Sequence, residues 1–363
     1  MKKVLFIGSI SSHYQQSIID ALKWSGFEVF TPVFEEYREV NRLIKFFYKN
    51  IHKRKFIHRL NGYNIDKLNE VNLDLVFIVN DYFMDEDFFI VCEKRGIPVY
   101  GYCMDALSFC NKAMEGNDVF GHLKYYTAYY SYEPSDVRYV VKNGKNVKYL
   151  PIGFDERYFS NDKPIDKCEY DIFFAGSLDN RRRELLNEIA KYAEANKLKM
   201  IVKTGIQLKK FESVLLIPKL LIRQSKFKAK YPYLFRCIDN NTLGIGKISK
   251  VYALSRFCIN IHSGANPEEH TGPNPRTFET MAAGSCLVTD VDHLLGTGFV
   301  DGKELIAYSD VEDLIKKLDY YNNNEKERQK LALVGRNACW EKFTQRKLIR
   351  SLLVEEGLCT KIF

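Results

Sequence analysis

The chain has 363 residues, of which 46% are hydrophobic and 28% are charged, and its formal net charge is +8. This length favours two domains of roughly 150 to 180 residues each, and the ordinary composition excludes extensive disorder. The positive charge indicates anionic partners such as nucleotides, phospholipid surfaces or acidic glycans. The nine cysteines include no CxxC pair, which is typical of reduced, buried thiols rather than of disulfides or zinc ligands.

The N-terminal apolar run ends at Gly8 and is too short for the core of a signal peptide. No run approaches the 18 apolar residues of a membrane-spanning helix. We therefore expect a cytoplasmic protein without a nucleic-acid partner, and contact with the inner face of the membrane is an open alternative. Two basic stretches, 42–59 and 211–230, could rest on anionic lipid, although packed helices with solvated lysines explain them at least as well.

Apolar runs and helical patterns alternate along the first part of the chain. The expected strands are 4–8, 27–30, 73–79, 97–103, 125–132 and 147–150. The expected helices are 17–25, 85–95 and 133–143, with a basic helix-like region at 37–70. Such alternation predicts β-α-β units and a parallel sheet.

A polar, broken stretch at 154–169 predicts a linker, after which the alternation restarts. The expected strands are 170–176, 199–203, 257–261 and 285–289. The expected helices are 182–195, 248–254, 275–283, 310–321 and 325–341, with a basic apolar insertion at 209–236. The chain is thus predicted to be α/β, with two Rossmann-like domains facing each other across a cleft in the layout called GT-B. The domains are 1–153 and 170–345, and 346–363 form a tail that could pack back on the first domain.

The stretch Gly272–Gly284 carries the strongest functional signal. Asn274 is a good N-cap, Pro275 suits the first helical position, and the closing glycine suits a left-handed C-cap. Free N–H groups and the helix dipole would bind an anion there, and Arg276 would add a contact to phosphate. Glu279, about one turn further on, could accept hydrogen bonds from two ribose hydroxyls. The alternative is a plain crossover helix with this glutamate facing solvent.

Further donor-binding candidates come from other strand ends. Gly176 would let the backbone approach phosphates, and either Arg181 or Arg182 would reach diphosphate oxygens. A basic helix start without a ligand is the alternative for these arginines. The remaining candidates are Lys203, Lys247, His262 and Thr277. A lone histidine is more often structural, so contact between His262 and a ligand competes with that explanation.

Several segments together resemble the CgeB-like (spore maturation protein) group of GT-B glycosyltransferases, with a C-terminal domain of the glycosyl transferases group 1 type. They are Tyr252–His262, Asn274–Asp290, Gly302–Leu305 and Tyr308–Ser309, with a weaker likeness in Val147–Asp155. The resemblance is strong over 170–345 and weaker over 1–155. It implies that the C-terminal half holds a nucleotide-sugar donor and that the N-terminal half holds the acceptor.

One departure from the larger related group concerns stereochemistry. Its retaining enzymes carry two glutamates separated by seven residues, the second at the place of Glu279. The first place here is Thr271, with Glu268 and Glu269 only nearby. The choice between retention and inversion therefore stays open.

An inverting enzyme would need a base that deprotonates an acceptor hydroxyl. His13, in the loop after the first strand, and Asp105, just past another strand, are the catalytic candidates. The first could instead be a surface residue and the second a helix N-cap. The triplets Asp85–Asp87 and Asp290–Asp292 suggest a metal, but metal-dependent glycosyltransferases use such pairs on a single-domain fold. We therefore expect no metal, since GT-B enzymes stabilise the leaving diphosphate with the helix dipole and basic side chains.

The expected activity is transfer of a sugar from a UDP- or GDP-type donor, without a further cofactor. The acceptor would be a hydroxyl of a glycan, a lipid-linked saccharide or a protein, in cell-envelope or surface polysaccharide biosynthesis. Two alternatives stay open. One is a non-catalytic spore or envelope assembly factor with this fold, and the other is a nucleotide-sugar epimerase.

Overall fold

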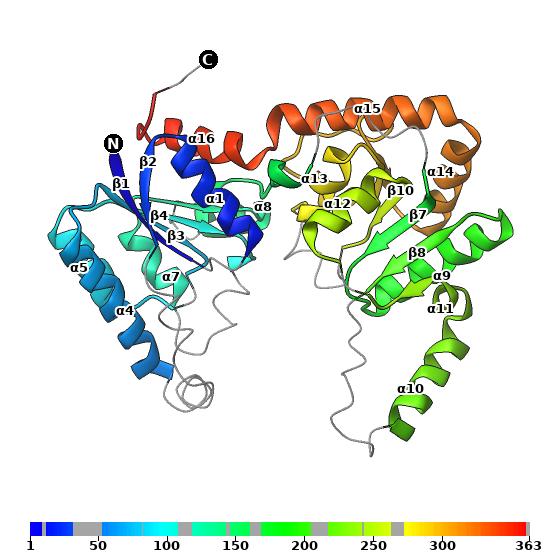
Figure 1. The fold of residues 1–363 in the computed structure, drawn as a ribbon, viewed down its shortest axis with the longest axis horizontal. Helices are drawn as coiled ribbons and strands as arrows, with labels where there is room; N and C mark the ends of the chain where they lie inside the picture. Colours follow the sequence, from blue (N-terminus) through cyan, green and yellow to red (C-terminus); the bar gives the residue numbers. More distant parts are fainter. Residues whose placement is uncertain are drawn as a thin grey trace. The chain divides into compact units, whose positions relative to one another are not determined.

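The strands of the computed structural model form two parallel sheets of six strands each (Figure 1). The described residues are 1–8, 12–31, 53–81, 83–107, 118–142, 146–159, 168–204, 217–241, 243–262 and 272–360. By its contacts, the chain divides into two compact units. The first comprises Met1–Asp155, Glu268–Gly272 and Phe343–Phe363, and the second comprises Glu156–Pro267 and Pro273–Lys342.

The first sheet has the order β2-β1-β3-β4-β5-β6. Its strands are β1 Lys2–Ile7, β2 Phe27–Phe30, β3 Leu75–Val79, β4 Val99–Cys103, β5 Ala128–Ser131 and β6 Lys148–Tyr149. Every residue of β3, β4 and β5 is buried, as expected for parallel strands covered on both faces. The helices are α1 His13–Trp24, α4 Lys53–Glu70, α5 Glu86–Lys94, α7 Val119–His122, η1 Leu123–Tyr125, α8 Pro134–Lys142 and α16 Gln345–Glu355.

The second sheet has the order β12-β11-β10-β7-β8-β9, which is a doubly wound arrangement. Its strands are β7 Tyr170–Ala175, β8 Met200–Lys203, β9 Ile238–Asp239, β10 Ser255–Asn260, β11 Cys286–Asp290 and β12 Ile306–Tyr308. The helices are η2 Glu156–Tyr158, α9 Asn180–Ala195, α10 Ile217–Lys230, α11 Pro232–Cys237, α12 Ile245–Ala253, α13 Pro275–Ala282, η4 Val291–His293, α14 Val311–Asn323 and α15 Glu325–Lys342. The prediction of an α/β chain with two Rossmann-like domains is confirmed.

The last described helix belongs to the first unit. Helix α16 packs against α1, and the two lie side by side in Figure 1. Phe154 joins this return of the chain through two backbone hydrogen bonds, with Phe343 O at 3.0 Å and Gln345 N at 2.9 Å. The guanidinium of Arg350 lies 5.3 Å from the ring centre of Trp24 on α1. These contacts make α16 part of the first unit's packing.

Several elements were not expected from the sequence, among them β9, β12, α7 and α16. Strands of two or three residues are too short to show an alternating pattern. Of the basic stretches, 42–52 and 211–216 lie outside the described residues. No helix in the described part of the chain is long and apolar enough to cross a membrane.

Candidate functional site

The candidate site lies at the switch point of the second sheet, where β7 and β10 pair side by side. In doubly wound sheets, ligands bind outside the carboxyl ends of the strands at this point. Gly176 and Ser177 follow β7, His262 follows β10, and Asp290 ends β11. Helix α13, which connects β10 to β11, begins at the same edge of the sheet.

Helix α13 forms as the sequence predicts. The side chain of Asn274 caps it by accepting a hydrogen bond from Arg276 N at 3.0 Å, and Pro275 takes the first helical position. Gly284 adopts a left-handed conformation with φ of +85°, which closes the helix. The predicted N-cap and C-cap are both confirmed.

The backbone donors at the start of α13 are all engaged, so the expectation of free N–H groups is wrong. Prolines 273 and 275 have no N–H to offer. Each remaining amide already has an acceptor: Gly272 N donates to Glu133, Asn274 N to His262, and Arg276 N and Thr277 N to oxygens of Asn274. Anion binding at this turn therefore depends on the helix dipole and on side chains.

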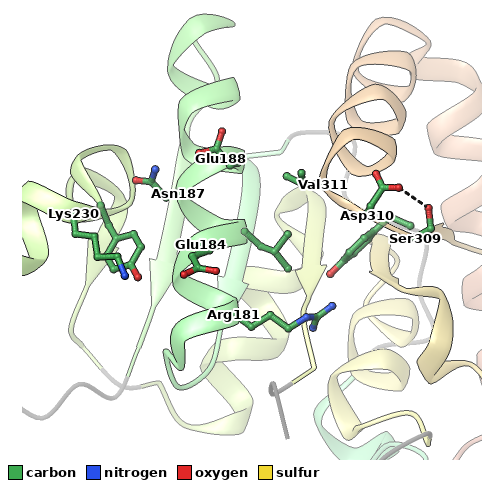
Figure 2. A pocket seen from close by; sticks show the side chains of 11 residues that line it. Arg181, Glu184, Asn187, Glu188, Lys230, Ser309, Asp310 and Val311 are labelled. Atoms are coloured by element: carbon green, nitrogen blue, oxygen red, sulfur yellow. Dashed lines mark hydrogen bonds between the residues drawn. The ribbon is translucent and has the colours of Figure 1, made fainter. Parts of the chain in front are cut away.

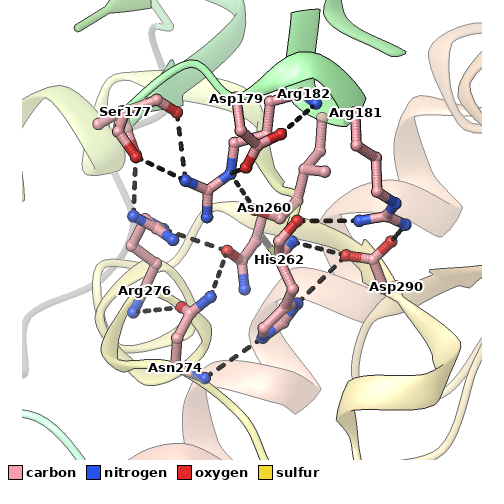
Figure 3. A network of polar contacts seen from close by, with 11 residues as sticks. Ser177, Asp179, Arg181, Arg182, Asn260, His262, Asn274, Arg276 and Asp290 are labelled. Atoms are coloured by element: carbon pink, nitrogen blue, oxygen red, sulfur yellow. Dashed lines mark hydrogen bonds and ion pairs between the residues drawn. The ribbon is translucent and has the colours of Figure 1, made fainter. Parts of the chain in front are cut away.

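Arg182 acts as a structural clamp (Figure 3). It is 5% exposed, and its Nε donates to Ile261 O at 2.9 Å. Its Nη1 donates to Ser177 O at 3.2 Å and to Ser177 Oγ at 2.8 Å. Burial and the neighbouring charge of Arg276 lower the pKa of Arg182 to about 10. Between the two predicted alternatives, the geometry thus leaves Arg181 better placed for a ligand.

Arg181 belongs to a second chain of polar contacts (Figure 3). Its Nη1 donates to His262 O at 2.9 Å, and its Nη2 forms an ion pair with Asp290 Oδ1. The other carboxylate oxygen of Asp290 accepts from His262 N at 2.7 Å and from His262 Nδ1 at 3.2 Å. Burial lowers the pKa of His262 to about 3, so the imidazole is neutral. Burial alone would raise the pKa of Asp290, but hydrogen bonds from His262 and Arg181 hold it well below its ordinary value.

Asn260, at the end of β10, holds the start of α13 through hydrogen bonds to its first residues. Its Oδ1 accepts from Asn274 Nδ2 at 2.9 Å and from Arg276 Nε at 3.1 Å. Its Nδ2 donates to Thr277 Oγ1 at 3.0 Å, so the hydroxyl of this fully buried threonine faces a protein amide. Sequence reasoning missed Asn260. The available signal was an amide side chain inside the apolar run 257–261.

Arg276 completes the cluster. Its Nη1 donates to Ala175 O at 3.3 Å, and a Cβ added at Gly176 would lie 3.1 Å from the same nitrogen. Its Nη2 has no hydrogen-bond partner in the described part of the chain. With Arg181 and Arg182, three guanidinium groups converge at the switch point, which makes the local potential positive.

Glu279 lies one turn into α13 and is 5% exposed. The alternative of a solvent-facing glutamate is therefore wrong. The hydroxyl of Tyr252 is buried close to it, and burial together with the charge of Glu279 raises the pKa of Tyr252 well above its ordinary value. A buried carboxylate in this position suits hydroxyl groups of a ligand that enters from the helix start.

The two predicted lysines lie apart from this cluster. Lys203 ends β8 and pairs with Asp239 on β9. Lys247 is exposed in the first turn of α12. Neither lysine has a hydrogen bond or ion pair with the cluster residues that the structure describes.

Among the residues that the structure describes, two groups of side chains have the spacing of metal ligands. In the first, ligand atoms of His262, Asp290 and His293 lie within 4.8 Å of one another. Both ring nitrogens of His262 are already hydrogen-bonded, and Arg181 occupies one oxygen of Asp290. A cation would displace these bonds beside three arginines, so the group fits a divalent metal poorly. The second group, His58 with Asp85 and Asp87, is on the first unit, where Asp85 caps α5.

A cavity of about 590 Å³ opens between α9 and the start of α14 (Figure 2). Its lining mixes cations with carboxylates and includes Arg181, Glu184, Asn187, Glu188, Lys230, Tyr308 and Asp310. Arg181 belongs both to this lining and to the network around Asp290. A ligand in the cavity would therefore reach the network directly through this arginine.

Polar side chains also follow the strands of the first sheet. Asp105, just after β4, accepts a hydrogen bond from Asn80 Nδ2 at 3.2 Å. His13 is the first residue of α1, so its expected place in a loop is wrong, because the helix begins four residues earlier than predicted. Its ring centre lies 3.9 Å from that of Tyr14. Thr271, Glu268 and Glu269 lie outside the described residues.

Buried carboxylates that the sequence analysis did not single out lie at this edge too. Asp81 accepts from His122 Nδ1 and from Tyr126 OH, both at 3.0 Å. Glu133 is fully buried and accepts from Gly272 N at 3.1 Å at each oxygen. Burial raises the pKa of Asp136 to about 6. The carboxyl edge of the first sheet is therefore rich in acidic groups.

Comparison with known proteins agrees with this architecture. Residues 225–353 match a family model described as glycosyl transferase-like. No curated protein matches the chain in sequence. Sucrose-phosphate synthase from Thermosynechococcus elongatus has a TM-score of 0.67 at 11% identity, over 99% of this chain and 99% of that chain.

Two further solved structures are similar. Anabaena HepE in complex with UDP-glucose has a TM-score of 0.60 at 10% identity, over 98% of this chain and 100% of that chain. A putative UDP-N-acetylglucosamine 2-epimerase from Listeria monocytogenes has a TM-score of 0.60 at 11% identity, over 98% of this chain and 96% of that chain. At such identities the likeness shows the fold alone. The chain has the GT-B fold, and a glycosyl transferase-like domain occupies part of its second half.

Proposed function

We propose that the protein is a glycosyltransferase that moves a sugar from a nucleotide-sugar donor to a hydroxyl acceptor. The observation that carries this proposal is the cluster at the β7/β10 switch point. There Arg181, Arg182 and Arg276 converge, and the buried Glu279 lies one turn further along α13. Guanidinium groups suit a diphosphate, and a carboxylate suits the two hydroxyls of a ribose.

The donor is proposed to be of the UDP or GDP type, and the UDP-glucose in the HepE complex supports the former. The leaving diphosphate would be stabilised by Arg276, Arg181 and the dipole of α13 without a metal or a further cofactor. The poor fit of a cation to the group around Asp290 supports this assignment.

The acceptor is assigned to the first unit, where Asp105 and His13 remain the candidates for the base. Replacing the true base by a residue of similar shape should lower kcat about 100-fold or more, with a smaller effect on the KM of the donor. Asp105→Asn and His13→Gln distinguish the two, with initial rates and both KM values as the measurement. If neither variant slows the reaction, the base lies elsewhere.

Membership of the CgeB-like group is supported by the motif between Asn274 and Asp290. A role in the cell envelope or in surface polysaccharide synthesis depends on that membership. The acceptor would be a glycan, a lipid-linked saccharide or a protein. Contact with the inner face of an anionic membrane is supported by Lys226, Lys228 and Lys230, which are exposed on α10.

A panel of nucleotide sugars tests the central proposal. The wild-type protein should bind UDP or GDP and hydrolyse one donor slowly or transfer its sugar to envelope acceptors. Glu279→Ala should weaken nucleotide binding about tenfold or more without unfolding the chain. Glu304→Ala, which removes a glutamate of similar burial outside the cluster, is the matched control and should bind normally. Nucleotide binding without turnover of any donor would instead favour an assembly factor.

An epimerase is the second candidate, because one of the similar structures carries that name. It requires formation of a sugar isomer from the donor in the absence of any acceptor. Chromatography of each donor after incubation decides between the two, and isomer formation would reject glycosyl transfer as the main activity.

A further inference from the structure

Asp290 is the residue that two parts of the candidate site share. It ends β11 and is 3% exposed. One carboxylate oxygen pairs with Arg181, and the other accepts two hydrogen bonds from His262 (Figure 3). An aspartate with both oxygens committed to protein partners has little capacity left for a ligand of its own.

The hydrogen bond to Asp290 determines which ring nitrogen of His262 carries the proton. Because Asp290 accepts at Nδ1, that nitrogen carries the proton, and Nε2 is left as an acceptor. Nε2 faces the amide of Asn274, with a separation of 3.4 Å. The ring is held flat against His293, with centroids 3.7 Å apart and an angle of 7° between the planes. The imidazole therefore links Asp290, through one hydrogen bond at each ring nitrogen, to Asn274, which caps α13.

The same carboxylate decides where Arg181 lies. This side chain is 39% exposed and lines the 590 Å³ cavity, so it could adopt other rotamers without its partner. The ion pair with Asp290 and the bond to His262 O hold it at the switch point.

We propose that Asp290 is a positioning residue for the donor turn, which it orders through His262 and Asn274 while it holds Arg181 beside that turn. The proposal rests on the proposed nucleotide site, but its first consequence needs no ligand. Without Asp290, the protonated and unprotonated nitrogens of His262 can exchange roles, and Asn274 N loses its acceptor.

Amide hydrogen exchange of the free protein tests this consequence. Asp290→Asn should accelerate exchange at the Asn274 amide about tenfold, whereas Asp292→Asn should leave it unchanged. Asp292 lies two residues away and is exposed, which makes it a matched control. His262→Phe keeps a ring against His293 but has no acceptor nitrogen, and it should accelerate the same amide even if Asp290→Asn does not fold. Unchanged exchange in a folded variant overturns the proposal.

A double-mutant cycle tests the link to the nucleotide site, with UDP and GDP as probes in calorimetric titrations. Asp290→Asn alone should weaken binding about tenfold. On a His262→Gln background, where an amide oxygen can accept from Asn274 without help, the same change should cost less than about threefold. Additive effects would show that Asp290 does not act through His262 and would overturn the proposed ordering of the donor turn. Wild-type protein that binds neither nucleotide refutes the proposed function instead, while the exchange result still decides the role of Asp290.

Discussion

The side chains at the carboxyl edges of the two sheets carry opposite charges. At the edge of the second sheet, arginines converge and each is tied to backbone carbonyls, to Asn260 or to Asp290. At the edge of the first sheet, carboxylates follow three successive strands, and Asp105 is only half-buried. One edge is thus cationic and held by many hydrogen bonds, whereas the other is acidic and partly accessible.

This difference matches the two tasks of a group transfer. A nucleotide diphosphate carries its charge throughout the reaction, so a rigid cationic edge can be assembled before it arrives. A hydroxyl acceptor is neutral and must lose a proton, which requires a carboxylate or an imidazole within reach. The comparison therefore supports donor binding by the second unit and acceptor chemistry by the first.

The rigidity of the cationic edge can be tested through its most buried member. Arg182→Met leaves the carbonyls of Ile261 and Ser177 without their donor, at about 1–3 kcal/mol for each unsatisfied group. We expect a total loss of about 3 kcal/mol in the free energy of unfolding. Asp105→Asn at the other edge should cost under about 1 kcal/mol, because it is half-buried. Urea denaturation measures both, and equal losses would contradict the contrast in rigidity.

One buried acid and one buried base predict opposite responses to pH in the two units. In the first unit, the raised pKa of Asp136, about 6, means that the folded state binds more protons than the unfolded chain between about pH 4 and 6. The free energy of unfolding should therefore fall there as pH rises, by about 2 kcal/mol. In the second unit, the lowered pKa of His262 means that the unfolded chain binds more protons below about pH 6.5. Stability should fall there as pH falls.

Hydrogen exchange followed by peptide mass analysis can resolve the two units within one sample. Peptides of β5 and of β10 should change protection in opposite directions between pH 4 and 6.5, after correction for the intrinsic exchange rate. Asp136→Asn should remove the response of the first unit alone. A common direction in both units would show that other groups dominate the titration.

The smallest expected effect concerns the amide held by Glu133. A Cβ at Gly272 would lie 2.8 Å from Pro134 Cδ and 3.0 Å from Tyr132 O. Gly272→Ala should thus cost the first unit about 1–2 kcal/mol through crowding. Gly244→Ser is a useful reference, because its φ is −70° and an added Cβ there meets nothing within 4 Å. Differential scanning calorimetry should show a larger loss for Gly272→Ala.

Local signals carried most of what could be predicted about the fold. Helix α13 was placed correctly because its cap, its first proline and its final glycine act over a few residues. The roles of Asn260 and Asp290 could not be predicted, because their partners come from other strands, and Arg181 lies 109 residues from Asp290 in the chain. The occupied N–H groups of the turn were missed for the same reason, since His262 and Glu133 had to be brought there by folding.

The packing of α16 against α1 also limits which segments of the chain can be exchanged with those of a related protein. The first unit is completed only when the chain comes back after residue 342, so neither unit is one uninterrupted stretch. A hybrid that borrows a donor-binding half from another enzyme needs matched junctions near 155 and 342, with the native α16 retained. A single junction would leave the apolar face of α1 against a foreign helix. Recombination of the acceptor and donor specificities proposed for the two units is thereby restricted to exchanges that insert the second unit into the first.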